Sequence, residues 1–190
     1  MARQVFLRAI FVFHRIIPPP QTFLNLLLQK SLTIMMSKLR NWIASPNGVR
    51  KIMNVYGPYA GAGVKVTHIA DDYSSASVEM NLRWYNTNYV GTHFGGSLYS
   101  MVDPIYMLLL MNSLGNDYIV WDKSACIDFI RPGKGRVTAH FELTEERLEE
   151  IRTATAGGDK MLPQWDVNIF DEEGKLVARV NKVLYVRKKR

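Results

Sequence analysis

The sequence predicts an α+β protein in which an antiparallel sheet wraps around a long central helix. Three observations predict this class: strand patterns are joined by short turns, one apolar helix at 98–114 dominates, and strands and helices do not alternate as they do in parallel α/β folds. With 47% hydrophobic and 22% charged residues, the 190-residue chain is long and apolar enough to bury a core.

The chain begins with a basic, apolar arm, residues 1–45. Residues 5–17 are apolar but interrupted by basic side chains, and prolines at 18–20 end any helix there because proline has no amide hydrogen. From residue 22 on, apolar residues recur at spacings of three or four, which predicts a basic amphipathic helix. These residues are Leu24, Leu28, Leu32, Met35, Leu39 and Trp42.

Three roles are open for this arm. The first is a helix that packs on the main domain or on a partner subunit. The second is peripheral contact with an anionic membrane surface, and the third is an organelle-targeting leader. Met35 and Met36 precede the main domain, so a native start near these residues is a further alternative.

Residues 46–190 are predicted to form a single domain. Its strands share an alternation of apolar and polar residues, and they are 64–67, 76–82, 119–130, 136–143, 164–170 and 176–186. Glycines at 61 and 63 are expected to open the first strand. Turns rich in glycine, proline or acidic residues, at 131–135 and 171–174, predict two hairpins.

The predicted helices of this domain are 49–56, 98–114 and a short one between Thr144 and Gly157. Thr144 is a hydroxyl cap, and the acids that follow it suit the positive end of the helix dipole. The 98–114 helix is apolar around nearly its whole circumference, whereas a sheet covers only one face. We therefore expect a second subunit to cover the rest, as a homodimer or a dimer of dimers.

The net charge of +7 is unevenly distributed along the chain. The first 70 residues hold nine basic side chains and no acidic one, and the last four residues are all basic. Residues 71–186 hold eleven basic and seventeen acidic side chains. Because the folded body is acidic, we expect no nucleic-acid partner.

Cysteine content and hydropathy exclude several classes of protein. Cys126 is the only cysteine, which excludes an internal disulfide framework and a cysteine-based zinc cluster. No apolar run approaches the roughly 20 residues that cross a bilayer. We expect a cytoplasmic protein with no metal ion and no cofactor.

The densest group of chemically useful residues lies just before the apolar helix. Gly95 and Gly96 leave the first amides of that helix uncovered, and such donors stabilise a carbonyl oxygen that gains negative charge. Asp103 follows two turns later and is a candidate base or nucleophile. Asn88 is a candidate orienting group, and His93 a candidate base.

Each of these residues also has a structural interpretation. The two glycines suit a turn, and Asp103 before Pro104 suits a cap at a helix break. His93 suits a hydrogen-bonding position in a loop, and Asn88 is common in turns.

The pattern Asn-x₆-Gly-Gly-x₆-Asp, formed by Asn88, Gly95, Gly96 and Asp103, resembles that of hotdog-fold acyl-CoA thioesterases of the phenylacetate-pathway type. The resemblance extends over most of residues 57–186. The chain is still more similar to an uncharacterised hotdog branch, domain of unknown function 4442. The segments that carry this second resemblance are 83–86, 89–96, 103–104, 118–123 and 129–133.

The thioesterase resemblance implies a role for each matched residue. Asp103 would be the nucleophile or general base, Gly95 and Gly96 would supply amides that polarise the thioester carbonyl, and Asn88 would face the reaction centre. In that family one pocket combines residues of two subunits. Two positions differ from the family pattern: Phe94 stands where the thioesterases have histidine, with His93 one residue earlier, and Pro104 follows Asp103.

The resemblance implies hydrolysis of acyl-CoA or another acyl thioester. A non-catalytic protein that binds acyl-CoA or assembles subunits is the alternative, and a hydroxyacyl-thioester dehydratase with His93 as base is a third. Phe94 and Ser97 are expected to contact the substrate. A basic rim is expected at the CoA phosphates, with a solvated turn as its alternative, and it comprises Arg131, Lys134 and Arg136. Asp122 and Lys123 are adjacent on a strand, face opposite sides, and should not pair.

Overall fold

The computed structural model describes residues 20–190, and the chain divides between Ala44 and Ser45 into two units. The described part of the first unit is helix α2 (Pro20–Ile43), which begins two residues before the predicted start. The apolar segment predicted at 5–17 and the first two prolines lie outside the described residues. Within residues 20–190, no helix combines the length and hydrophobicity that a membrane span needs.

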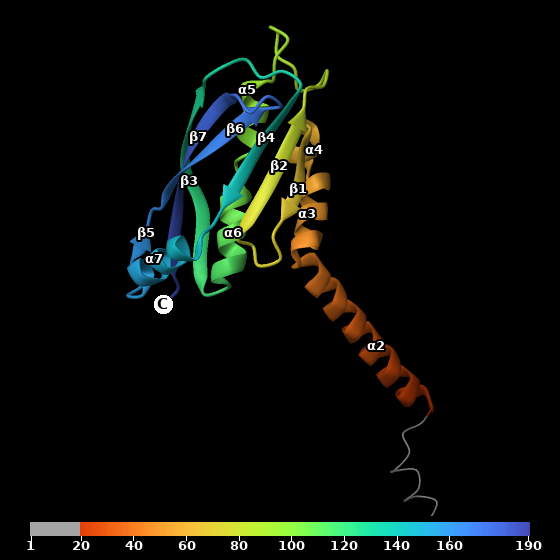
Figure 1. Ribbon diagram of the computed structural model, residues 1–190. Helices are drawn as coiled ribbons and strands as arrows, with labels where there is room; N and C mark the ends of the chain where they lie inside the picture. The colour runs from red at the N-terminus through yellow and green to blue at the C-terminus, as the bar shows by residue number, and fades with distance from the viewer. Residues whose placement is uncertain (1–19) are drawn as a thin grey trace, which may run out of the picture. The chain divides into compact units, whose positions relative to one another are not determined.

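The second unit is built on one antiparallel sheet (Figure 1). Its strands run in the order β1-β2-β4-β6-β7-β3, with the short β5 paired to β7. The strands are β1 (Val64–Ile69), β2 (Ser75–Asn81), β3 (Tyr118–Phe129), β4 (Arg136–Glu142), β5 (Lys160–Met161), β6 (Gln164–Asp171) and β7 (Leu176–Lys188). Strands β2 and β4 alternate buried and less buried residues, because one face of the sheet covers the core.

One predicted hairpin is confirmed and the other is wrong. Strands β6 and β7 are antiparallel neighbours joined by the turn at 171–174. The turn at 131–135 does not join a hairpin, because β3 pairs with β7 whereas β4 pairs with β2 and β6. Proline and glycine mark a chain reversal but do not determine which strands pair across it.

Three helices of this unit flank the sheet, namely α3 (Pro46–Val55), α4 (Gly57–Ala62) and α7 (Glu145–Thr155). Thr144 caps α7 as predicted, since its side chain accepts a hydrogen bond from the Arg147 amide. The strand expected to open at residue 61 is wrong there: residues 57–62 form α4, which ends at Gly63 with φ +76°. A Cβ on Gly63 would also lie 2.8 Å from Asn86 Nδ2. Both the positive φ and this close contact therefore favour glycine at position 63.

The central helix is two helices, α5 (Gly95–Ser100) and α6 (Ile105–Leu114), and not the single helix predicted over 98–114. Pro104, which has no amide hydrogen, lies at the break and forms the N-cap of α6. In Figure 1, α6 lies behind the sheet. Its residues Ile105 and Leu110 are buried, whereas Met111 is 47% exposed. The α+β class with a sheet around a central helix is therefore confirmed, but one side of α6 is left partly open in the single chain.

Candidate functional site

The segment that precedes α5 is a loop organised by Asn88. Its Oδ1 accepts hydrogen bonds from the amides of Val90 and Thr92, each at 3.1 Å. Its Nδ2 donates to Thr92 Oγ1 at 2.9 Å and to the His93 carbonyl at 3.2 Å. These four bonds fill the donor and acceptor capacity of the carboxamide. Asn88 therefore holds the loop in shape.

His93 ends this loop and is only 3% exposed. Its Nε2 lies 3.0 Å from the Gly135 carbonyl, which can only accept, so Nε2 carries the proton in that bond. Burial lowers the pKa of His93, and the bond to Gly135 opposes this only partly. Nδ1 is buried without a partner among the described residues. The imidazole is therefore neutral and anchored, which favours its structural interpretation.

Gly95 and Gly96 are the first two residues of α5, so their amides have no carbonyl partner inside the helix. Both glycines lie against aromatic rings. A Cβ on Gly95 would lie 2.7 Å from Phe129 Cζ, and a Cβ on Gly96 would lie 2.5 Å from Phe94 Cε1. The two rings therefore occupy the space that a side chain at either position would take, and a larger residue there must displace a ring.

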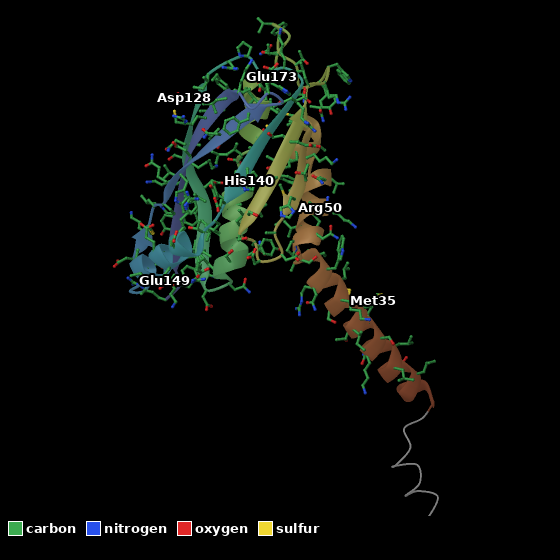
Figure 2. All side chains as sticks on the ribbon, in the orientation of Figure 1. Met35, Arg50, Asp128, His140, Glu149 and Glu173 are labelled. Carbon is green, nitrogen blue, oxygen red and sulfur yellow. The ribbon has the colours of Figure 1, made fainter. Side chains whose placement is uncertain are left out.

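A first pocket, of about 380 Å³, lies between this loop and the end of β3. Among the predicted site residues it is lined by Asn88, His93, Gly95 and Arg131. This is the end of the sheet at which α5 lies in Figure 1. In Figure 2, Asp128 on β3 and Glu173 in the β6–β7 turn are labelled at the same end. Apolar Leu98, Phe129 and Ile130 complete much of the wall, so this pocket suits an elongated, partly apolar ligand.

Asp103 lies in the break between α5 and α6, and its carboxylate does not act as a helix cap. Its Oδ1 accepts a hydrogen bond from Tyr99 Oη at 2.7 Å and another from Lys182 Nζ at 3.1 Å. The side chain is 46% exposed. Among the described residues, Oδ2 has no hydrogen-bond partner. The carboxylate is thus fixed through one oxygen and accessible through the other.

Lys182, on β7, is the centre of a charged cluster that also contains Asp103 and Asp122. Its side chain is fully buried, and Nζ lies 2.9 Å from Asp122 Oδ1 in an ion pair without aligned hydrogen-bond geometry. Nζ also lies 5.5 Å from the centre of the Tyr99 ring. Burial opposes the charge of Lys182, but Asp122 and Asp103 outweigh it and raise its pKa. The ammonium therefore stays protonated throughout the neutral range.

Burial raises the pKa of Asp122, because the attraction of Lys182 compensates for it only in part. Tyr59 on α4 lies beside both carboxylates; burial, with the two negative charges, raises the pKa of its phenol. Burial and the hydrogen bond to Asp103 also raise the pKa of Tyr99. Both phenols are thus neutral donors: Tyr59 binds the Met101 carbonyl at 3.2 Å, and Tyr99 binds Asp103.

A second pocket, of about 340 Å³, opens at this charged cluster. Asp103, Asp122, Tyr59 and Tyr99 line it, whereas Gly95 lies in the first pocket. Within the described residues, neither of these pockets contains both Asp103 and Gly95. One chain therefore does not bring the predicted base and the predicted amide donors into a common pocket.

The residues expected to contact substrate are distributed unevenly. Phe94 is 56% exposed and covers Gly96, and Ser97 is buried at 6% exposure. Arg131 lines the first pocket, and Lys134 is exposed in the loop beyond it. Arg136 lies 3.5 Å from Glu172 in an exposed ion pair. Only Arg131 of the three cations is thus placed at the mouth of a described pocket.

Sequence reasoning missed the role of Lys182, although a signal was present. Val180, Leu184 and Val186 alternate along β7 and are all fully buried, and Lys182 falls in phase with them. A lysine in phase with core residues predicts a buried charge that needs a partner. Asp122 supplies it, which agrees with the prediction that Asp122 does not pair with Lys123.

No group of three histidine, cysteine, aspartate or glutamate side chains within residues 20–190 is arranged to hold a metal ion. The groups that line the two pockets include the carboxylates of Asp103 and Asp122, the phenols of Tyr59 and Tyr99, and the guanidinium of Arg131.

Known proteins match the chain in family and in fold. Residues 48–186 match the family model named domain of unknown function 4442 (DUF4442). No curated protein sequence matches the chain. A protein of unknown function from Pseudomonas aeruginosa, described as "Probable Thioesterase", is 19% identical with a TM-score of 0.66, over 73% of this chain and 93% of that one.

Two further solved structures have the same fold. A thioesterase from Haemophilus influenzae is 16% identical, with a TM-score of 0.56, over 76% of this chain and 91% of that one. Thioesterase superfamily member 2 from Mus musculus is 20% identical, with a TM-score of 0.54, over 74% and 96%. The chain therefore has the hotdog fold of thioesterase-like proteins, and it belongs to the DUF4442 family.

Proposed function

We propose that this protein is an acyl-thioester hydrolase that acts on acyl-CoA or a related acyl thioester. The observation that carries the proposal is the state of Asp103. Its Oδ1 is fixed by Tyr99 and Lys182, its Oδ2 has no partner among the described residues, and the side chain is half-exposed at a pocket. A carboxylate held in this way suits a general base or a nucleophile.

In this proposal, Asp103 accepts a proton from water as the water oxygen attacks the thioester carbonyl. The carbonyl oxygen becomes an oxyanion, which the amides of Gly95 and Gly96 stabilise. The tetrahedral intermediate then releases the thiol, to which the proton on Asp103 is returned. Asn88 contributes by holding the loop that leads into α5, because its carboxamide is fully bonded within that loop.

The proposal requires a homodimer, since Asp103 and Gly95 belong to different pockets of one chain. Each complete site would combine Asp103 of one subunit with Gly95 of the other. Two features support a second copy: β3 is an edge strand of twelve residues, and Met111 of α6 is 47% exposed. Light scattering that reports a monomer at the assay concentration would contradict this arrangement.

The activity is tested with a panel of acyl-CoAs and a chromogenic reagent that detects the released thiol. Cys126 is exposed, so the protein itself adds a fixed background of one thiol per chain. Asp103→Asn is expected to lower kcat by about 100-fold or more without changing the oligomer. Asn112→Ala on α6 is the control, because its side chain is exposed and bonds only to the Leu108 carbonyl.

A mixing experiment tests whether the site is shared between subunits. Asp103→Asn and Gly95→Val are each expected to be inactive as homodimers. When the two variants exchange subunits, each mixed dimer regains one intact site, which corresponds to about a quarter of the wild-type sites in an equal mixture. No recovery, despite proven subunit exchange, would show that each site lies within one chain.

The other outcomes identify the alternatives. Binding of acyl-CoA without thiol release indicates a binding protein and rejects hydrolysis. Double-bond formation from a hydroxyacyl thioester indicates a dehydratase; the burial of His93 and its bond to Gly135 make this the less favoured alternative.

A further inference from the structure

The most unusual group outside the predicted site is the fully buried ammonium of Lys182. It lies on the face of β7 that otherwise buries small or apolar side chains, among them Ala178, Val180 and Leu184. Burial of a charge is costly even when the charge is paired, and an apolar residue would serve packing alone at least as well. The position of Lys182 therefore calls for an explanation beyond packing.

The contacts of Lys182 suggest what it does. Nζ reaches across from β7 to Asp103 Oδ1, at 3.1 Å, and to Asp122 Oδ1 on β3, at 2.9 Å. Asp103 lies in a helix break, so no regular helical backbone fixes its side chain. The bond from Lys182 joins this break to β7, a strand paired on both sides, and Tyr99 Oη donates to the same oxygen from α5.

We propose that Lys182 is a positioning residue for the reaction at Asp103: it anchors Oδ1 against strand β7 and leaves Oδ2 as the reacting atom. This inference rests on the proposed function, in which Asp103 is the base or nucleophile. Asp122 then has a supporting role, because a second carboxylate stabilises the buried ammonium that Asp103 needs.

The titratable groups that face Asp103 come from four parts of the chain. They are Tyr99 of α5, Lys182 of β7, Asp122 of β3, and two tyrosines of α4, the N-cap Tyr56 and Tyr59 within the helix. Lys182 is the one cation in this set. Without it, the Asp103 carboxylate loses both the donor that holds its Oδ1 and the one positive charge that faces it.

The experiment compares two full-length variants that differ only at residue 182, Asp122→Asn and Lys182→Met/Asp122→Asn. The double variant removes one positive and one negative charge together, so that it folds even where Lys182→Met alone does not. Lys175→Met is the control, since Lys175 is an exposed lysine in the turn before β7. Two quantities are measured: the pH dependence of kcat/KM, and the titration of the Asp103 carboxyl carbon by NMR.

We expect the acid limb of kcat/KM and the NMR titration of Asp103 to move together to higher pH by about one unit or more when Lys182 is removed. Lys182→Arg is expected to restore both to within a few tenths of a unit. An unchanged titration of Asp103 in the folded double variant overturns the inference. A uniform fall in activity with no pH shift also overturns it, because it indicates a structural role alone.

The outcome also separates this inference from the proposed function. If Asp103→Asn retains full hydrolysis, the proposed function fails whatever Lys182 does. If the NMR titration shifts but the acid limb does not, Lys182 controls the charge of Asp103 and Asp103 is not the base, which rejects the catalytic role assigned to both.

Discussion

Phe129, the last residue of β3, packs so closely on Gly95, the first residue of α5, that a Cβ on Gly95 would lie 2.7 Å from its ring. The contact joins the edge strand of the sheet to the start of the central helix. It also forms a wall of the first pocket, since both residues line it. The shape of that pocket therefore depends on the absence of a side chain at position 95.

Gly95→Ala tests this contact. The added methyl must displace the Phe129 ring, and because that ring is 57% exposed we expect a loss of only about 1 kcal/mol in unfolding free energy. In a Phe129→Ala background the same substitution should cost nothing, so a double-mutant cycle by urea unfolding should show coupling. Gly61→Ala is the control: nothing lies within 4 Å of its Cβ position in α4, and the substitution should be neutral or stabilising.

Lys182→Met tests the charged cluster through stability. The substitution leaves Asp103 and the mostly buried Asp122 without their cation, and we expect a loss of about 3 kcal/mol in unfolding free energy. Adding Asp122→Asn should recover part of this loss. Lys175→Met removes only the exposed pair with Glu173, labelled in Figure 2, and should change stability by less than about 0.5 kcal/mol. Equal effects of the two lysine substitutions would be inconsistent with a buried ion pair.

His93 makes stability depend on pH in a defined direction. Its pKa in the folded state lies below the usual 6.5, so the unfolded chain binds the proton more readily. Stability from this residue is present above 6.5 and is lost as the pH falls below that value. Urea unfolding at pH 7.5 and 5.5 should therefore show a larger decrease in the wild type than in His93→Gln.

Asn88→Ala distinguishes a loop-forming role from a role in orienting substrate. The substitution removes four hydrogen bonds, and we expect a loss of about 1–3 kcal/mol in unfolding free energy together with faster proteolysis of the loop before α5. Asn112→Ala removes one exposed bond and should have little effect. Wild-type stability combined with a large fall in kcat would instead assign Asn88 to the reaction.

Local sequence patterns predict the α+β class, most strand positions and the cap of α7 by Thr144, because alternation, helical spacing and capping depend on residues close together in the chain. The DUF4442 resemblance was likewise readable from local motifs such as Tyr89 to Gly96. The pairing of the strands cannot be predicted from such local motifs. Whether β3 joins β4 or β7 depends on contacts between residues far apart in the sequence, and a turn at 131–135 is compatible with both.

The surroundings of the candidate site residues, in contrast, depend on how distant parts of the chain pack together. Lys182 and Asp103 are 79 positions apart in the sequence, and only the fold brings their side chains within hydrogen-bond distance. All donors and acceptors of the Asn88 carboxamide bond within its own loop. Burial lowers the pKa of His93, and the rings of Phe129 and Phe94 pack against Gly95 and Gly96. Burial and hydrogen bonding set the charge and accessibility of a side chain, and both are sums over neighbours that the order of residues does not specify.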